Sequence, residues 1–158
     1  MAADKSDIRR AAESLLDQGF LAAARDPAVT VGEPLPVFDA AARQHSWLVP
    51  LQRGSRLAGF AQLSMQLEPL RVSSFQRDPS RYDECPDVAD WTDPARILQR
   101  AATQARSDEQ LSQPVLSFDG DPSRLAWRVE AQDSAGRQRV LYVAGNVVYE
   151  ATGGRGLG

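Results

Sequence analysis

A pattern of residues between positions 34 and 63 returns 80 positions later, between positions 114 and 143. Each copy holds a proline, then a Phe-Asp pair, and then a tryptophan after seven further residues. The matched positions are Pro34, Phe38, Asp39, Trp47 and Val49 in the first copy and Pro114, Phe118, Asp119, Trp127 and Val129 in the second. Self-similarity at a fixed spacing indicates a repeated structural unit, and two copies are too few for a solenoid. The sequence therefore predicts a tandem pair of small units.

Composition limits the class of partner. The apolar fraction of 42% and the charged fraction of 25% are typical of a globular domain. A net charge of −3 argues against nucleic-acid binding, because that function requires a basic surface that displaces counterions from phosphates. No apolar run reaches the roughly 18 residues that a membrane span requires. We therefore expect no nucleic-acid partner and no membrane span.

Cysteine usage and the first residues bear on the compartment. Cys85 is the single cysteine, which excludes an internal disulfide and a cysteine-based metal cluster. The residues that follow Met1 are polar and show no apolar segment of a signal peptide. The sequence is compatible with a cytoplasmic protein, or with an exported one from which a signal peptide has been removed.

The first unit is predicted over residues 1–76. Apolar residues at Ile8, Ala12, Leu15 and Leu16 follow the spacing of one helix face, with Ser6 as the expected N-cap and Gly19 as the expected stop. Extended chain is expected over residues 29–31, followed by strands at 37–38, 47–52, 56–64 and 67–75.

The second unit is predicted over residues 93–152, after a linker over residues 77–92. Asp93 followed by Pro94 fits an N-cap and the first turn of a helix. Apolar residues continue that helix face as far as Ala105. Strands are expected at 114–118, 125–132, 140–144 and 147–150, and residues 153–158 are expected to form a flexible glycine-rich tail.

The predicted fold is α+β, with two repeated units that each contain a helix followed by a three- to four-stranded antiparallel sheet. Gly54, Gly136 and the pair Gly145-Asn146 are expected in the turns between strands. They are not expected to bind phosphate, because none lies between a strand and the start of a helix.

Two stretches resemble known families. The run from Leu125 to Ala144 resembles the hairpin of PepSY domains, and the preceding helix suits their helix-then-sheet plan. The segments 32–38 and 47–51 look like the cystatin-like units found in propeptides of bacterial secreted proteases. The resemblance implies units that inhibit or escort proteases, or that serve as envelope-associated binding modules. The chain departs from cystatins in lacking their Gln-Val-Val-Ala-Gly segment.

Two positions are candidates for nucleophilic catalysis. His45 is adjacent to Ser46, and these residue types can act as general base and nucleophile in a hydrolase. No glycine-serine elbow accompanies the pair. A solvated histidine in a connection between strands is the favoured interpretation. Cys85 has Asp83, Glu84 and Asp87 as neighbours, and their negative charge disfavours the reactive thiolate. A buried thiol is favoured there.

Carboxylates raise two further possibilities. The acidic residues between positions 83 and 93 suggest a calcium site, but their spacing does not match an EF-hand loop. They are better explained as a solvated linker that ends in a helix cap. Asp39 and Asp119 would suit a glycosidase if they faced each other across a cleft. Their repetition instead favours a structural role, such as capping the turn that follows a strand.

Trp47 and Trp127 are candidate stacking platforms for sugars or bases. Because both stand at the same place in their units, at the expected start of a strand, burial in the core is favoured.

No catalytic, cofactor-binding or metal-binding residue is therefore assigned, and no cofactor is expected. The predicted function is that of a non-enzymatic protein-binding module, such as a protease inhibitor or a propeptide-like chaperone. It would act through exposed sheet edges, which an extended segment of a partner can join. The alternative is a structural protein that assembles into an oligomer or an envelope-associated complex.

Overall fold

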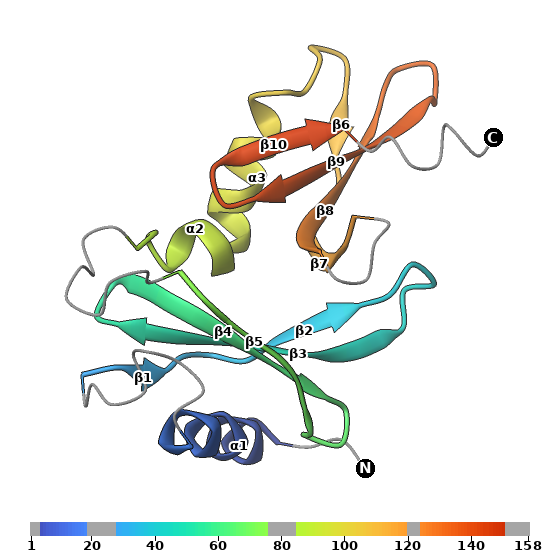
Figure 1. The fold of residues 1–158 in the computed structure, drawn as a ribbon. Helices are drawn as coiled ribbons and strands as arrows, with labels where there is room; N and C mark the ends of the chain where they lie inside the picture. The colour runs from blue at the N-terminus through green and yellow to red at the C-terminus, as the bar shows by residue number, and fades with distance from the viewer. Residues whose placement is uncertain (1–3, 19–27, 76–84, 120–123, 151–158) are drawn as a thin grey trace. The chain divides into compact units, whose positions relative to one another are not determined.

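The protein has an α+β fold with two antiparallel sheets of five strands each (Figure 1). The computed structural model describes residues 4–18, 28–75, 85–119 and 124–150. The chain divides into two compact units. The first unit comprises Met1–Val37 and Gln44–Val88, and the second comprises Phe38–Arg43 and Ala89–Gly158. The α+β class and the two antiparallel sheets agree with the sequence prediction.

The first sheet is built around two long strands. This part of the chain contains α1 (Lys5–Asp17), β1 (Thr30–Val31), β2 (Leu35–Phe38), β3 (Gln44–Arg53), β4 (Arg56–Ser64) and β5 (Pro69–Ser74). Phe38, the last residue of β2, is assigned to the second unit. Strands β1 and β2 both pair with β3, which pairs with β4, and β4 pairs with β5. The hairpin of β3 and β4 is the predicted one, and Gly54 in its turn has a φ of 58°.

Helix α1 begins two residues earlier than the sequence predicts. Asp4 is the N-cap, and its Oδ1 accepts a hydrogen bond of 2.9 Å from the backbone N–H of Asp7. The predicted cap, Ser6, lies inside the helix, and its hydroxyl donates to the Asp4 carboxylate over 2.8 Å. The helix ends with Gln18 as C-cap, and the predicted stop at Gly19 lies outside the described residues.

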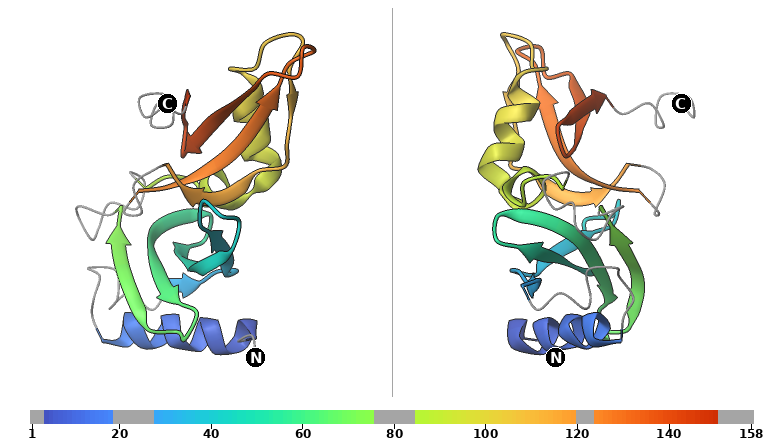
Figure 2. Two further views of the ribbon diagram at one scale, coloured as in Figure 1. Left: turned by 90° about the vertical axis from the view of Figure 1, so that its right-hand side faces the viewer. Right: turned by 60° about the vertical axis from the view of Figure 1, so that its left-hand side comes forward.

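The core of the first unit lies between α1 and one face of its sheet (Figure 2). The apolar stripe predicted for the helix is buried there. The core consists of Ile8, Ala12, Leu15, Leu16, Val29, Val49, Leu51, Ala58, Ala61, Leu63 and Cys85, with Trp47 partly buried against it. Burial of this apolar stripe is what fixes α1 on the sheet, since a single isolated helix of this length is marginal in water.

The second unit has its own sheet. It contains α2 (Ala89–Thr92), α3 (Pro94–Ala102), β6 (Gln110–Leu111), β7 (Val115–Phe118), β8 (Leu125–Gln132), β9 (Gln138–Ala144) and β10 (Val147–Glu150). Strands β6 and β7 both pair with β8, β8 pairs with β9, and β9 pairs with β10. Each sheet thus has five strands, and the prediction of three to four is wrong. The two-residue strands β1 and β6 are too short to produce an alternating pattern.

Helix α3 begins where the sequence predicts. The Asp93 side chain accepts a hydrogen bond of 3.0 Å from the N–H of Ala95, and Pro94 occupies the first turn. Its buried residues Ile97 and Ala101 belong to the predicted face, but the helix ends at Ala102 and not at Ala105. Within the described residues, no helix has the length and apolar character needed to span a membrane.

The turn between β9 and β10 is held against the helices of the second unit. Gly145 has a φ of 61°, and a Cβ there would lie 3.0 Å from the Trp91 ring. Arg100 Nη1 donates to the Gly145 carbonyl over 2.8 Å, and Trp127 Nε1 donates to the Trp91 carbonyl over 2.8 Å. Glycine is therefore required in this turn both by backbone conformation and by space.

The predicted linker is only partly described, because residues 76–84 fall in a gap of the described ranges. After the gap, residues 85–88 belong to the first unit, and α2 (Ala89–Thr92) belongs to the second. The backbone N–H of Leu57 donates to the Pro86 carbonyl, and the N–H of Val88 donates to the Ser55 carbonyl, each over 2.8 Å. The turn at residues 120–122 and the predicted tail at residues 153–158 also lie outside the described residues.

A buried ion pair lies at one end of the second sheet. Arg139 Nε and Nη2 donate to the two carboxylate oxygens of Glu109, each over 2.7 Å. The backbone N–H of Arg106 donates to the same carboxylate over 2.7 Å. The Glu109 side chain is only 2% exposed. The Arg139 guanidinium, and then the Arg106 N–H, lower the pKa of the Glu109 carboxyl from 4.5 to about 2.

This ion pair predicts a specific loss of stability in acid. A carboxyl whose pKa is lower in the folded protein stabilises the fold fully above its unfolded pKa, near 4.5, and loses that contribution as the pH falls toward about 2. Urea unfolding midpoints measured across this range are expected to fall more steeply for the wild type than for Glu109→Gln, which cannot titrate. Parallel curves for the two proteins would show that Glu109 does not contribute to the acid sensitivity.

Candidate functional site

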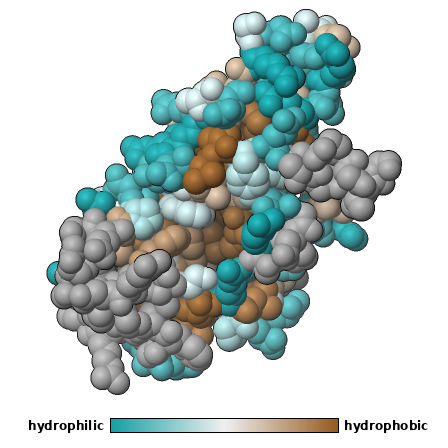
Figure 3. Space-filling model, turned by 45° about the horizontal axis from the view of Figure 1, so that its top comes forward, coloured by the Kyte–Doolittle hydropathy of each residue, from teal (hydrophilic) through white to brown (hydrophobic). Residues whose placement is uncertain are grey.

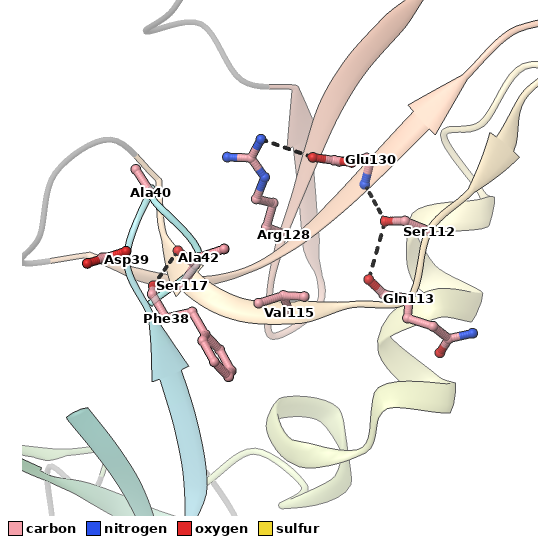
Figure 4. Close-up of a pocket in the computed structure, with 10 residues that line it drawn as sticks. All are labelled: Phe38, Asp39, Ala40, Ala42, Ser112, Gln113, Val115, Ser117, Arg128 and Glu130. Carbon is pink, nitrogen blue, oxygen red and sulfur yellow. Dashed lines mark hydrogen bonds and ion pairs between the residues drawn. The ribbon is translucent and has the colours of Figure 1, made fainter. Parts of the chain in front are cut away.

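A groove on the second unit is the candidate site (Figure 4). It is open to solvent and has a volume of about 490 Å³. Its lining consists of Phe38, Asp39, Ala40, Ala42, Ser112, Gln113, Val115, Ser117, Arg128 and Glu130. In Figure 4 the residues of the loop Phe38–Arg43 stand on one side and Ser112, Gln113 and Glu130 on the other, with Val115 and Arg128 between them.

Strand alternation explains which residues of β7 line the groove. Val115 and Ser117 lie two residues apart, so they project from the same face of the sheet. Leu116 projects from the opposite face and is buried, with Trp127 as its partner on β8. Val115 pairs with Arg128 and is 40% exposed, which is unusual for a large apolar side chain in this protein. The groove therefore follows the sheet face opposite to the buried Leu116.

Asp39 shapes the other side of the groove. Its Oδ1 accepts hydrogen bonds from the backbone N–H groups of Ala41 at 2.9 Å and Arg43 at 3.0 Å. Ala42 has a φ of 63°, in the left-handed region that non-glycine residues seldom occupy. Asp39 thus caps the turn after its strand, the role that its repetition favours. Ser117 Oγ donates to the Phe38 carbonyl over 2.7 Å and fixes the loop beside β7.

Polar groups also line the groove. Arg128 Nη2 is 3.3 Å from Glu130 Oε1. Ser112 holds β8 from the neighbouring segment, since its Oγ accepts from the Glu130 N–H over 2.9 Å and its N–H donates to the Glu130 carbonyl over 2.8 Å. Phe38, Ala40, Ala42 and Val115 form the apolar part of the lining, with Val115 between the two sides of the groove. This lining suits the removal of an apolar side chain from water, with polar groups nearby to orient the ligand.

The predicted catalytic pair lies elsewhere. His45 belongs to strand β3, so the prediction that it stands in a connection is wrong, although its side chain is exposed as expected. His45 Nδ1 lies 2.9 Å from Ser46 Oγ, and the Gln62 amide donates to the same hydroxyl over 2.9 Å. Ser46 is fully buried, so a substrate cannot reach its hydroxyl. Ser46 and Gln62 thus form a buried polar contact between β3 and β4, and the exposed His45 lies beside it.

Among the other candidates that the structure describes, Cys85, Asp90 and Asp93 have structural roles. Cys85 is buried in the core of the first unit, as favoured. Of the acidic series, Asp93 caps α3, and Asp90 pairs with Arg96 at 3.0 Å and Arg100 at 2.7 Å. Asp83 and Glu84 fall outside the described residues. Among the residues that are described, no group of three or more histidine, cysteine or acidic side chains is placed to hold a metal ion.

The repeated residues differ between the two units. Trp127 is buried, whereas Trp47 is only partly buried, and each lies inside its strand and not at the start. Asp119, the candidate in the second unit, is bound by two neighbouring side chains. Its carboxylate accepts from the Tyr149 hydroxyl at 2.6 Å and from Arg124 Nε at 3.2 Å. Burial, together with this carboxylate, raises the pKa of Tyr149.

Sequence reasoning did not identify the groove. Its lining comes from two stretches, 38–42 and 112–130, which are about 70 residues apart in the sequence. No short sequence motif contains both. Val115 was the one accessible signal, because alternation from the apolar Leu116 places it on the opposite face of the strand.

Comparison of the chain with protein-family models, with curated proteins and with solved structures finds no match.

Proposed function

We propose that this protein is a non-enzymatic protein-binding module whose groove holds an apolar side chain of an extended segment of its partner. The observation that carries the proposal is the exposed Val115 in the apolar part of the groove lining. A volume of about 490 Å³ lies within the range of roughly 300–1,000 Å³ that is typical of ligand sites. The apolar part of the lining favours a side chain such as leucine or phenylalanine over a polar one.

An extended segment is the form of partner that β7 favours. Strand β7 pairs with β8, and no second strand pairs with β7 among the residues that the structure describes. An unpaired strand offers backbone N–H and C=O groups to another chain, while pockets beside it select alternate side chains. The groove beside β7 supplies such a pocket, so backbone pairing and side-chain selection would act together.

A protease or a protease-associated protein is the partner class that we propose. Its support is the resemblance of residues 125–144 to PepSY hairpins and of the 32–38 and 47–51 segments to cystatin-like propeptide units.

We also propose that the two units are copies of one helix-then-sheet plan. Support comes from the strand pairing, since β1 and β2 both pair with β3 and β6 and β7 both pair with β8. The groove lies on the second unit, and function is proposed to lie where the two units differ.

Selection of peptides from a random library against the whole chain tests the proposal. The selected peptides are expected to share a large apolar residue. Val115→Asp is expected to weaken their binding by at least about tenfold, because a carboxylate in the apolar part of the lining would have to be desolvated. The measurement is the dissociation constant of resynthesised peptides for each variant.

Val147→Asp is the matched control. Val147 is also an exposed valine near an edge of the same sheet, 56% exposed on β10, but it does not line the groove. Its replacement is expected to leave peptide binding unchanged. Equal losses in the two variants, or selected peptides without an apolar residue in common, would contradict the proposed site.

Assembly is a second candidate function, favoured by the apolar surface outside the groove. Figure 3 shows that apolar residues reach the surface among polar ones on the face that it presents. Val147 on β10 and Leu70 on β5 are the most exposed large apolar residues described. Light scattering at increasing protein concentration separates the two functions, because a chain that stays monomeric argues against assembly.

A further inference from the structure

A second, smaller cavity lies at the end of the second sheet, away from the groove lining. The turn that follows α3 and the turn between β8 and β9 stand at the same end of this sheet (Figure 1). The cavity between them has a volume of about 160 Å³ and is lined by Arg106, Glu109, Asp133, Arg137, Gln138 and Arg139. We call it the arginine cavity, because three of its six lining residues are arginines.

The two carboxylates of the arginine cavity are already engaged within the protein. The Glu109 carboxylate accepts hydrogen bonds from Arg139 Nε and Nη2 and from the backbone N–H of Arg106. Asp133 Oδ1 accepts from the backbone N–H groups of Ala135 and Arg137 at 3.0 and 2.9 Å, and its Oδ2 accepts from Arg137 Nε at 3.0 Å. Both side chains are at most one-tenth exposed. Neither carboxylate is available to a cation from solvent.

The guanidinium groups, in contrast, face the solvent. The Arg137 side chain is 83% exposed, and its hydrogen bond to Asp133 uses only Nε. Arg106 is exposed, and among the described residues its guanidinium has no hydrogen bond or ion pair, although its charge helps to lower the pKa of Glu109. Both arginines therefore line the cavity with N–H donors that are free to bind a ligand, whereas the two carboxylates are largely buried.

Nearby acidic residues do not occupy these donors. Asp108 Oδ2 accepts from the backbone N–H and the hydroxyl of Ser134 at 3.3 and 3.0 Å. Glu150 lies 3.8 Å from Arg139 Nη1 but does not line the cavity. Among the charged residues that line the cavity, Arg106 and Arg137 are the exposed ones.

We propose that the arginine cavity binds a phosphate group through Arg106 and Arg137. Planar guanidinium groups match phosphate oxygens in pairs of parallel hydrogen bonds, and such charge-assisted bonds are stronger than neutral ones. The volume suits an anion of a few heavy atoms and is well below that of sites for larger organic ligands. This site is independent of the groove and of the function proposed for it.

Thermal unfolding of the whole chain with inorganic phosphate tests the site, with chloride at equal ionic strength as the reference. A second arm uses glycerol phosphate, which separates a phosphate group carried on a larger molecule from the free ion. The unfolding midpoint is expected to rise saturably with phosphate beyond the effect of chloride, since a ligand that binds the folded state stabilises it.

Two substitutions make the test specific. Arg106→Gln removes an unpartnered, exposed guanidinium, so it is expected to fold normally and to weaken apparent phosphate affinity by about tenfold or more. Arg10→Gln removes an exposed arginine on α1 and is expected to change nothing. The proposal is overturned if neither phosphate compound raises the midpoint beyond chloride, or if Arg106→Gln responds as the wild type does.

Discussion

Replacing Trp127 with alanine is expected to lower the free energy of unfolding by about 3–5 kcal/mol, the usual cost of deleting a large buried aromatic side chain. Trp127 is buried on the face of β8 opposite to the groove. Its Nε1 also donates to the Trp91 carbonyl over 2.8 Å, so the substitution removes both apolar contact and a hydrogen bond. Urea unfolding followed by circular dichroism measures the change, provided that the slope of the transition is unaltered.

Conservative replacements separate the two contributions. Trp127→Phe keeps an aromatic ring and leaves the Trp91 carbonyl without its indole donor, which is expected to cost about 1–3 kcal/mol. Trp47 is the matched residue of the first unit, and its Nε1 is buried without a partner in the described part of the chain. Trp47→Phe removes that unsatisfied group and is expected to cost less. An equal or greater loss for Trp47→Phe would contradict this difference between the repeated tryptophans.

Replacing Ile8 with alanine is expected to lower the free energy of unfolding by about 2–5 kcal/mol. Ile8 is fully buried on α1 in the core of the first unit. The substitution leaves a cavity between the helix and the sheet, and close-packed surroundings relax only partly to fill it. The shift of the urea midpoint measures the loss.

Leu70→Ala is the control for this core substitution. Leu70 lies on β5 of the same unit and is 51% exposed. Its replacement is expected to change the free energy of unfolding by no more than about 0.5 kcal/mol. Similar losses for Ile8→Ala and Leu70→Ala would show that α1 is not held on the sheet by its apolar stripe.

The elements that the sequence predicted well have strong local causes. The stripe that begins at Ile8 has the helical period, and Asp93-Pro94 combines a cap with a residue that suits the first helical turn. Gly145 permits the positive φ that a tight turn requires. Each of these signals depends on residues close in sequence, and no distant contact overrides it.

The missed elements have weaker local causes. Strand β6 has two residues and α2 has four, so neither is long enough for its pattern to repeat. Strand β1 lies within the segment 29–31, for which the sequence predicts extended chain. The choice of Asp4 over Ser6 as the cap of α1 depends on which carboxylate or hydroxyl reaches a free N–H. Both residue types are common at that position, so sequence alone does not decide between them.

The site was predictable only in its parts. The capping role of Asp39 follows from its place after a strand, and the structure confirms it. The groove requires the loop 38–43 to stand beside β7, which depends on the bond between Ser117 and the Phe38 carbonyl. That bond joins residues 79 positions apart. Likewise, the adjacency of His45 and Ser46 suggested catalysis, whereas burial of the Ser46 hydroxyl is a tertiary property.

Hydrogen exchange on the whole chain, with and without a selected apolar peptide, tests most directly whether the groove is the partner site. If it is, the peptide slows amide exchange in β7 and in the loop 38–43, while the exchange of β5 and β10 stays unchanged. Slowed exchange confined to β5 or β10 would place the partner on another sheet edge and contradict the assignment of the groove.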